Sequence, residues 1–267
     1  MRAWIAVLLL AFAFNADAVN SKKLTITGSS TVAPLASELA KKFEAKNPGV
    51  RIDIQTGGSS RGVNDQRQGL NDIGMVSRAL NPDETDLQAH TIARDGICII
   101  LHKTNPVSSL TSQQVVDIYT GKIKNWKDVG GKDAPITVVS KAEGRSTLEL
   151  FLSYFKLKNS EVKSSVLVGD NEQDVKTVVG NPNSIGYVSI GTAEYGIKHG
   201  VAIKSLPLEG VAPSTENVLN GKFALARPLN FVTKSKPEGL VKQFIEFAQS
   251  KEAVSVVKDQ FFVPLAK

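Results

Sequence analysis

The sequence predicts an α/β fold with mostly parallel sheets. Two observations lead to this prediction. Short apolar segments rich in Val and Ile alternate with segments in which apolar residues recur at helical spacing. In addition, no low-complexity linker and no fixed-period repeat divides the chain. Strands that alternate with helices are typical of parallel sheets, because each helix carries the chain back to the start of the next strand.

The predicted strands are short apolar runs, several of which are followed directly by Gly. LTIT at 24–27 is the first of them, and GICIILH at 96–102 contains the only Cys. The predicted strands are 24–27, 51–56, 73–77, 96–102, 136–140, 185–190 and 231–234.

The predicted helices carry apolar residues three or four positions apart. Val32, Leu35, Leu39 and Phe43 have this spacing after the first strand. The segment 111–121 ends at a Gly, which is a common stop signal for a helix. The predicted helices are 32–43, 60–69, 111–121, 147–156 and 239–250.

Residues 1–18 are predicted to be a signal peptide. Arg2 gives a positive start, residues 3–14 are apolar throughout, and Ala16-Asp17-Ala18 fits the small-residue cleavage pattern. The apolar run is shorter than the roughly 20 residues that span a bilayer. No Cys lies near the cleavage site. We therefore expect a soluble, periplasmic or secreted protein that begins near Val19.

Composition narrows the classes of partner. The net charge of +6 fits an anionic ligand, although it also fits an ordinary solvated surface. Aromatic residues make up 6% of the chain and are not interleaved with a basic stripe, so no nucleic-acid partner is expected. Cys98 stands alone and the three histidines are scattered. No metal site and no cofactor are therefore expected.

One local unit recurs three times: a strand, a loop of Gly, Ser and Thr, and a helix start. We call these the first loop (TITGSSTVAP, 25–34), the second loop (IQTGGSSRGV, 54–63) and the third loop (VVSKAEGRST, 138–147). The first turn of a helix has backbone N–H groups without partners and a partial positive charge. Hydroxyl groups add donors, and Gly lets the backbone approach a ligand closely. Each loop alone could be a simple helix cap, whereas three together indicate a tetrahedral oxyanion site.

Basic residues accompany these loops. Arg61, Lys141 and Arg145 lie in the second and third loops, and Arg78 follows the strand at 73–77. Each could be an ordinary surface charge, but their position also suits an anion.

The motifs of the chain closely resemble those of the periplasmic phosphate-binding proteins of phosphate ABC transporters, which are type II periplasmic binding proteins. The resemblance covers nearly the whole mature chain and also includes RPLNFVTK at 227–234. The motifs that occur in the family's order are GSSTVAPL (28–35), GGSSRGV (57–63), DIGMVSR (72–78), GRST (144–147) and SIGYVS (184–189).

The resemblance implies a two-lobed fold with two crossover segments and a ligand cleft between the lobes. The first lobe would comprise 19–104 and 206–267, and the second lobe 105–205. The protein would be a monomer that captures inorganic phosphate or a related oxyanion by lobe closure and delivers it to the membrane permease of an ABC transporter. It would not be an enzyme.

The resemblance also implies the ligand residues. Ser30 would contribute its hydroxyl and Thr31 its backbone N–H from the first loop. Ser59 would act from the second loop. Ser146 and Thr147 would act from the third loop, in the opposite lobe.

Two positions depart from the family pattern. Many relatives have an Asp where this chain has Arg78, and that Asp accepts a hydrogen bond from the ligand O–H that phosphate has and sulfate lacks. Relatives also commonly have Arg where this chain has Lys141, whereas Arg145 replaces a Ser or Gly. Arg78, Lys141 and Arg145 complete the predicted ligand set, and the exact oxyanion stays open.

Two other functions fit parts of the sequence. Residues 58–62 match the G-x-S-x-G pattern of serine hydrolases around Ser60, with Asp170 or Asp174 and then His199 in the order of a triad. This alternative leaves the first and third loops without a purpose. A non-transport extracellular scaffold with the same fold is the other alternative.

Overall fold

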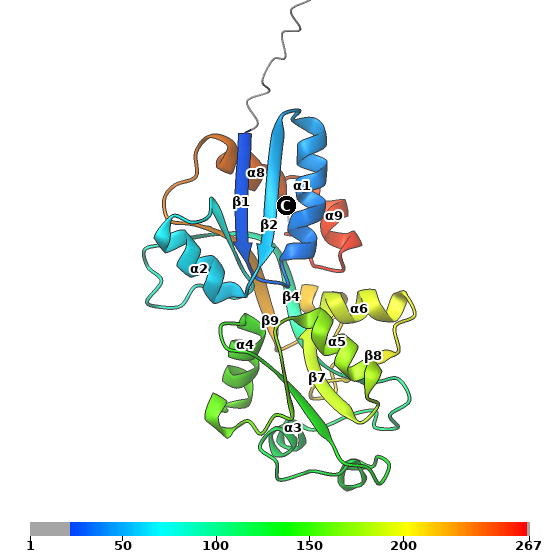
Figure 1. Ribbon diagram of the computed structural model, residues 1–267. Helices are drawn as coiled ribbons and strands as arrows, with labels where there is room; N and C mark the ends of the chain where they lie inside the picture. The colour runs from blue at the N-terminus through cyan, green and yellow to red at the C-terminus, as the bar shows by residue number, and fades with distance from the viewer. Residues whose placement is uncertain (1–21, 266–267) are drawn as a thin grey trace, which may run out of the picture.

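The middle of the chain forms one lobe, and the two ends of the chain together form the other (Figure 1). The computed structural model describes residues 22–265, so the predicted signal peptide lies outside the described residues. Both lobes consist of a sheet covered by helices, and two long strands join them at a narrow waist. The predicted two-lobed α/β fold is confirmed.

The sheet of the first lobe contains three parallel strands, and next to them β9 and the first part of β4 pair with each other in antiparallel fashion. Strand β1 lies between β2 and β3, and β9 runs antiparallel to β3. The core forms where the apolar face of α1 meets aromatic residues of β9 and α8, such as Phe231 and Phe244. The elements of this lobe are β1 (Lys22–Gly28), α1 (Ala33–Lys46), β2 (Val50–Thr56), α2 (Ser59–Gln68), β3 (Ile73–Val76), β9 (Ala226–Thr233), α8 (Gly239–Ala248) and α9 (Ala253–Asp259).

The second lobe has its own core. Tyr119, Phe151 and Tyr187 pack their rings together at its centre, with Phe151 stacked on Tyr187 at 4.2 Å between ring centroids. The elements of this lobe are α3 (Ser112–Tyr119), η1 (Trp126–Val129), β5 (Thr137–Lys141), α4 (Ser146–Phe155), η2 (Asn159–Glu161), β6 (Val166–Val168), α5 (Asn171–Gly180), β7 (Ser184–Ser189), α6 (Ile190–Lys198), β8 (Ile203–Ser205) and α7 (Thr215–Leu219).

Strand β4 (Gln88–His102) belongs to both sheets. Its first part, up to Gly96, pairs with β9, and its continuation from Ile97 pairs with β7 and β8.

The second core includes apolar residues from the segment that leads back to the first lobe, namely Leu206, Leu208, Val218, Phe223 and Leu225. A division of the chain near residues 96 and 226 therefore fits the two cores better than the predicted boundaries at 104/105 and 205/206. The crossover carries no turn signal, because it is one continuous strand.

The direction of the strands differs in part from the prediction. Strands β1, β2 and β3 are parallel, as are β5, β6 and β7. All pairings that involve β4 or β9 are antiparallel, because these two strands run between the lobes in opposite directions. The prediction of mostly parallel sheets is therefore wrong for the strands at the waist.

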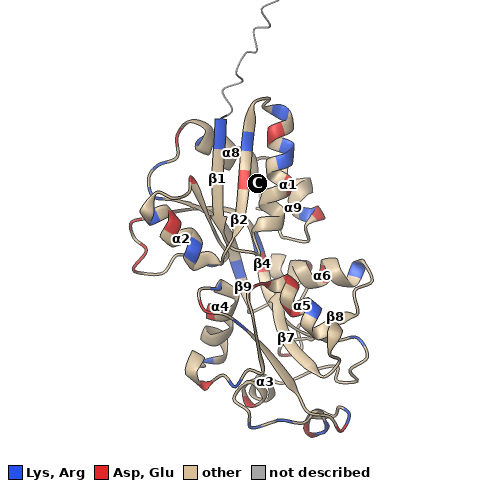
Figure 2. Ribbon diagram, in the orientation of Figure 1, with Lys and Arg blue, Asp and Glu red and all other residues tan. Residues whose placement is uncertain are grey.

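Two further properties bear on the surroundings of the protein. Among residues 22–265, no helix has the length and apolar character needed to cross a membrane. Basic and acidic residues are interspersed over both lobes in the view of Figure 2 rather than collected on one lobe.

Candidate functional site

The three predicted loops meet at the waist. The N-terminal ends of α1 and α2 in the first lobe face those of α4 and α5 in the second lobe (Figure 1). The N–H of Ser60 in the second loop donates to the carbonyl of Gly144 in the third loop at 3.2 Å. The lobes are therefore closed upon each other, and the loops that were predicted to share a ligand are in direct contact.

Glycine is required where the second loop meets the third. Gly58 has φ 95°, a conformation that other residues rarely adopt. A Cβ at this position would lie 2.5 Å from the Gly144 carbonyl oxygen and 2.8 Å from Cδ of Arg145. Only a residue without a side chain therefore lets the two loops approach so closely.

Arg227 lies at the centre of this meeting point. It is the second residue of β9 and is 3% exposed. Its Nε and Nη2 donate to Oδ2 of Asp95 at 3.1 Å and 2.9 Å. Nη1 donates to Ser77 Oγ at 3.3 Å and to Thr147 Oγ1 at 3.1 Å. Nη2 also donates to Thr31 Oγ1 at 3.2 Å. One guanidinium thus contacts hydroxyl groups from both lobes.

Thr31 connects the lobes a second time. Its Oγ1 also accepts a hydrogen bond from Nδ2 of Asn171, at the start of α5, at 3.2 Å. Because Oγ1 accepts from two donors, the hydroxyl proton of Thr31 is left to donate elsewhere. The Thr31 N–H, which was predicted to face the ligand, instead donates to Ser29 Oγ at 3.2 Å. The side chain is therefore the better candidate for a ligand contact.

The other predicted hydroxyl groups also lie at this meeting point. Ser59 is buried, and its Oγ accepts the N–H of Ser77 at 3.1 Å, which leaves the hydroxyl proton free. Ser30 is half-buried and begins the turn that leads into α1. Ser146 is buried, and its Oγ has no hydrogen-bond partner among residues 22–265. A buried hydroxyl without a protein partner is unusual, so this donor is available to a ligand. Ser184 and Ser250 also have such hydroxyls, but neither belongs to the three loops.

Arg145 is the basic residue that the loops leave without a carboxylate. Its side chain crosses from the third loop to Gly58 in the other lobe, and its Nε is buried without a hydrogen-bond partner in the described part of the chain. No ion pair of Arg145 occurs among residues 22–265. Arg145 and Ser146 thus show that the start of α4 carries donors without an acceptor among the described residues.

Arg78 does not belong to this donor set. Its Nη1 and Nη2 each lie 2.7 Å from an oxygen of Glu84, and its Nε lies 2.7 Å from Oε2 of Glu149. Both terminal nitrogens are therefore hydrogen-bonded to Glu84, and Nε has Glu149 as an ion-pair partner without forming an aligned hydrogen bond. Burial by itself would raise the pKa of Glu84, but the Arg78 guanidinium holds that pKa below its usual value.

Lys141 is also engaged elsewhere. Its ammonium forms a buried ion pair with Asp174 of α5 and lies 5.3 Å from the centroid of the Tyr187 ring. Burial lowers the pKa of Lys141 and raises the pKa of Asp174, and their mutual attraction opposes both shifts. Lys141 thus fixes the end of β5 inside the second lobe, just before the third loop.

The residues of the hydrolase alternative are not assembled. The hydroxyl of Ser60 lies 3.4 Å from Glu149, and Asp174 is paired with Lys141. The exposed His199 ring bonds the backbone carbonyl of Tyr195 at the end of α6. Residues 22–265 also contain no group of three His, Cys, Asp or Glu side chains that could hold a metal ion.

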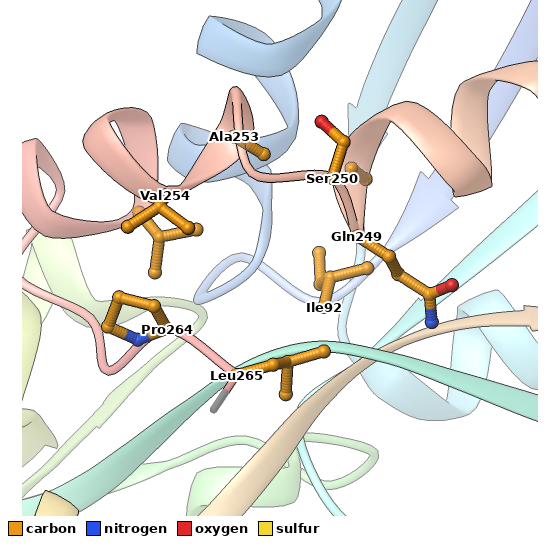
Figure 3. A pocket seen from close by; sticks show the side chains of 9 residues that line it. Ile92, Gln249, Ser250, Ala253, Val254, Pro264 and Leu265 are labelled. Atoms are coloured by element: carbon orange, nitrogen blue, oxygen red, sulfur yellow. The ribbon is translucent and has the colours of Figure 1, made fainter. Parts of the chain in front are cut away.

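A small pocket in the first lobe is a poor alternative for the site. It lies between α8, α9 and the end of the chain, and Figure 3 shows mainly apolar side chains such as Ile92, Val254 and Leu265 around it. Its side-chain amide, Gln249 Nε2, already donates to the Thr91 carbonyl at 2.9 Å. The Ser250 hydroxyl is the one side-chain donor there without a partner among the described residues, and a single donor leaves most oxygens of a tetrahedral anion without hydrogen bonds.

A donor-lined cleft that two lobes close around hinge strands is the arrangement of a substrate-binding protein. Residues 15–252 match the family model for the PBP superfamily domain. The phosphate-binding protein PstS of Bacillus subtilis is 30% identical over 92% of this chain and 81% of its own length. The chain belongs to the PBP superfamily and, within it, to the family of the phosphate-binding proteins named PstS.

Solved structures agree with this assignment. A phosphate ABC transporter substrate-binding protein from Clostridium perfringens, crystallised with bound phosphate, is 36% identical with a TM-score of 0.85. That alignment covers 92% of this chain and 100% of the other. An ABC-type phosphate transport receptor from Vibrio cholerae is 30% identical with a TM-score of 0.74, over 91% and 100% of the two chains.

Arg227, Asn171 and the serines 29 and 77 were missed as site residues in the sequence. Ser29, Ser77 and Arg227 lie within recognised motifs, but none of them was assigned a ligand role. Arg227 becomes central only because strand β9 brings it beside residues that are far away in sequence.

Proposed function

We propose that this chain is an exported substrate-binding protein that captures inorganic phosphate, or a closely related tetrahedral oxyanion, for import by an ABC transporter. The observation that carries the proposal is the buried donor pair without partners at the start of α4, Ser146 Oγ and Arg145 Nε. Family membership supports phosphate as the anion, because the named relatives are phosphate-binding proteins.

The donors that would surround the anion come from both lobes. Ser30, Thr31 and Ser59 act from the first lobe, and Ser146 and Thr147 act from the second. Each of these residues lies at or just before the start of α1, α2 or α4, where backbone N–H groups and the helix dipole favour negative charge.

Two arginines act at the anion in this proposal, and only Arg145 brings a charge that no carboxylate balances. Arg145 would bind the anion directly, because its guanidinium has no carboxylate partner in the described chain. The charge of Arg227 is balanced by Asp95, and its guanidinium orients the hydroxyls of Thr31 and Thr147 so that their protons can point to the anion. Arg78 and Lys141 act indirectly, through ion pairs that hold the surrounding loops.

Ligand capture would be a shift in the population of lobe arrangements. An anion that bonds donors of both lobes gains contacts only in the closed state, and it therefore favours closure. Motion would occur where β4 and β9 pass between the lobes. No covalent step is involved: the closed monomer would dock on the membrane permease, which opens it and accepts the anion.

Selectivity between phosphate and sulfate depends on acceptors at the site. Asp95 accepts from Arg227 with Oδ2 and from the Gly191 N–H, at 3.3 Å, with Oδ1. Glu84 accepts from Arg78 with both oxygens. Since both carboxylates are engaged, we expect phosphate to be preferred over sulfate by a smaller margin than a free carboxylate would give.

Isothermal titration calorimetry on the mature protein, stripped of bound anion, tests the proposal. Phosphate is titrated first, and sulfate follows at the same pH and salt concentration. We expect phosphate to bind with a Kd of about 1 μM or below, roughly −8 kcal/mol. The absence of heat and of any thermal shift with either anion would contradict the proposal and favour the extracellular scaffold.

A further inference from the structure

Arg78 lies between two carboxylates that belong to different lobes. Glu84 follows β3 in the first lobe and binds both terminal nitrogens of the guanidinium at 2.7 Å. Glu149 lies in α4 of the second lobe, and its Oε2 is 2.7 Å from Arg78 Nε. The ion pair with Glu149 therefore bridges the closed cleft.

The two halves of this arrangement differ in how firmly they are held. Glu84 is buried and also accepts the N–H of Asn81 at 2.7 Å, so that Arg78 and Glu84 form a fixed unit within the first lobe. The Glu149 side chain is 34% exposed, while that of Arg78 is 6% exposed. Its other oxygen lies 3.4 Å from Ser60 Oγ, again in the first lobe. Both oxygens of Glu149 thus make contacts across the cleft.

We infer that Glu149 is a closure latch, which closes onto the preformed Arg78–Glu84 unit and retains the anion without touching it. The inference rests on the proposed function, because retention is measured as slower release of the anion. When the lobes separate, Arg78 keeps Glu84 but loses Glu149. The latch therefore stabilises the closed state alone, and this difference between the two states is what shifts their equilibrium.

The latch gives position 78 a role different from the predicted one. A residue expected to bind the ligand instead sets how long the cleft stays shut. A pocket beside the latch is lined by Arg78, Glu149 and Leu150, and also by Arg227, whose guanidinium lies where the loops meet. Opening at the latch would therefore expose the anion site to solvent on this side.

The size of the effect follows from the exposure of Glu149. Ion pairs with one partly exposed member contribute modestly, so the variant Glu149→Gln is expected to release phosphate about three to ten times faster than the wild type. The rate of association should change less than the rate of release, because Glu149 does not contact the anion as it enters.

The test measures association and release of phosphate by stopped-flow fluorescence for the wild type, Glu149→Gln and the control Glu246→Gln. The control removes one negative charge from an exposed ion pair within α8, so it reports the effect of net charge alone. Small-angle scattering of the anion-free proteins gives a second readout: Glu149→Gln should be more open on average than the wild type and the control.

The outcomes separate the two proposals. If the wild type binds phosphate but Glu149→Gln releases it as slowly as the wild type does, the latch is wrong and the proposed function stands. If Glu149→Gln and Glu246→Gln accelerate release equally, the effect is one of net charge and the latch is again wrong. If the wild type does not bind phosphate, the proposed function fails, and scattering alone decides whether Glu149 holds the lobes together.

Discussion

The two halves of the cleft differ in how far their polar groups are already satisfied. In the first lobe, Ser29 Oγ donates to Ser77 Oγ at 3.0 Å, and the Ser77 N–H donates to Ser59 Oγ at 3.1 Å. In the second lobe, Ser146 Oγ and Arg145 Nε are buried without partners among residues 22–265. The first lobe thus holds a preformed half of the site, whereas the second lobe holds donors that have no acceptor within the described protein.

This difference shows how one motif can serve two purposes. The same combination of Gly, Ser and a helix start forms hydrogen bonds within the protein on one side of the cleft and leaves donors without protein partners on the other. Substitutions on the two sides should therefore separate effects on folding from effects on binding.

The largest expected effect is on folding and lies inside the second lobe. Lys141→Met leaves the buried carboxylate of Asp174 without its partner, so the free energy of unfolding should fall by about 3 to 5 kcal/mol. Denaturant unfolding measures it. The control Lys127→Met removes an exposed pair with Asp133 and should cost about 1 kcal/mol or less.

The same variant tests where Lys141 acts. Below its unfolding temperature, Lys141→Met should bind phosphate within about threefold of the wild type, because the ammonium faces Asp174 rather than the cleft. A large loss of affinity without loss of stability would return Lys141 to the ligand set predicted from the sequence.

Arg227 joins the two halves, so its replacement should have the largest effect on binding. Arg227→Lys keeps the charge but cannot bond Thr31, Thr147 and Asp95 together. Phosphate affinity should fall by at least about a hundredfold in calorimetry. An affinity near that of the wild type would mean that the hydroxyls do not depend on this guanidinium.

Ser146 and Ser59 give the sharpest comparison between the halves. Ser146→Ala should weaken phosphate binding by about 1 to 3 kcal/mol while leaving the apo protein as stable as before, because its hydroxyl has no partner there. Ser59→Ala should weaken binding and also lower stability by about 1 kcal/mol, because the Ser77 N–H loses its acceptor. Calorimetry and thermal unfolding together distinguish the two, and equal loss of stability would refute the difference.

The features that could be predicted from the sequence are local ones. The first helix and the three loops depend on apolar spacing and on Gly, Ser and Thr close together in the chain, and the structure places them where they were expected. Each predicted strand overlaps an observed one, but β4 and β9 begin earlier than predicted, and the short strands β6 and β8 were not predicted. Ser59, Ser146 and Thr147 are buried at the meeting of the lobes for the same reason. The family resemblance supplied the two lobes.

The features that could not be predicted are pairings over long distances. A sequence shows that residues 78 and 141 are basic, but it does not show that Glu149 and Asp174 lie beside them. The boundary between the lobes has no local signal in the sequence, because β4 runs through both sheets without a turn.

A crystal structure of the mature protein grown with phosphate is the most direct test of the central claim, which is that donors of both lobes enclose one tetrahedral anion. We expect the phosphate within hydrogen-bond distance of Ser146 Oγ, Arg145 Nε and the Thr31 hydroxyl, with Arg78 still bound to Glu84 and Glu149. A phosphate held by one lobe only, or bound outside the three loops while Ser146 Oγ stays without a partner, would contradict the account.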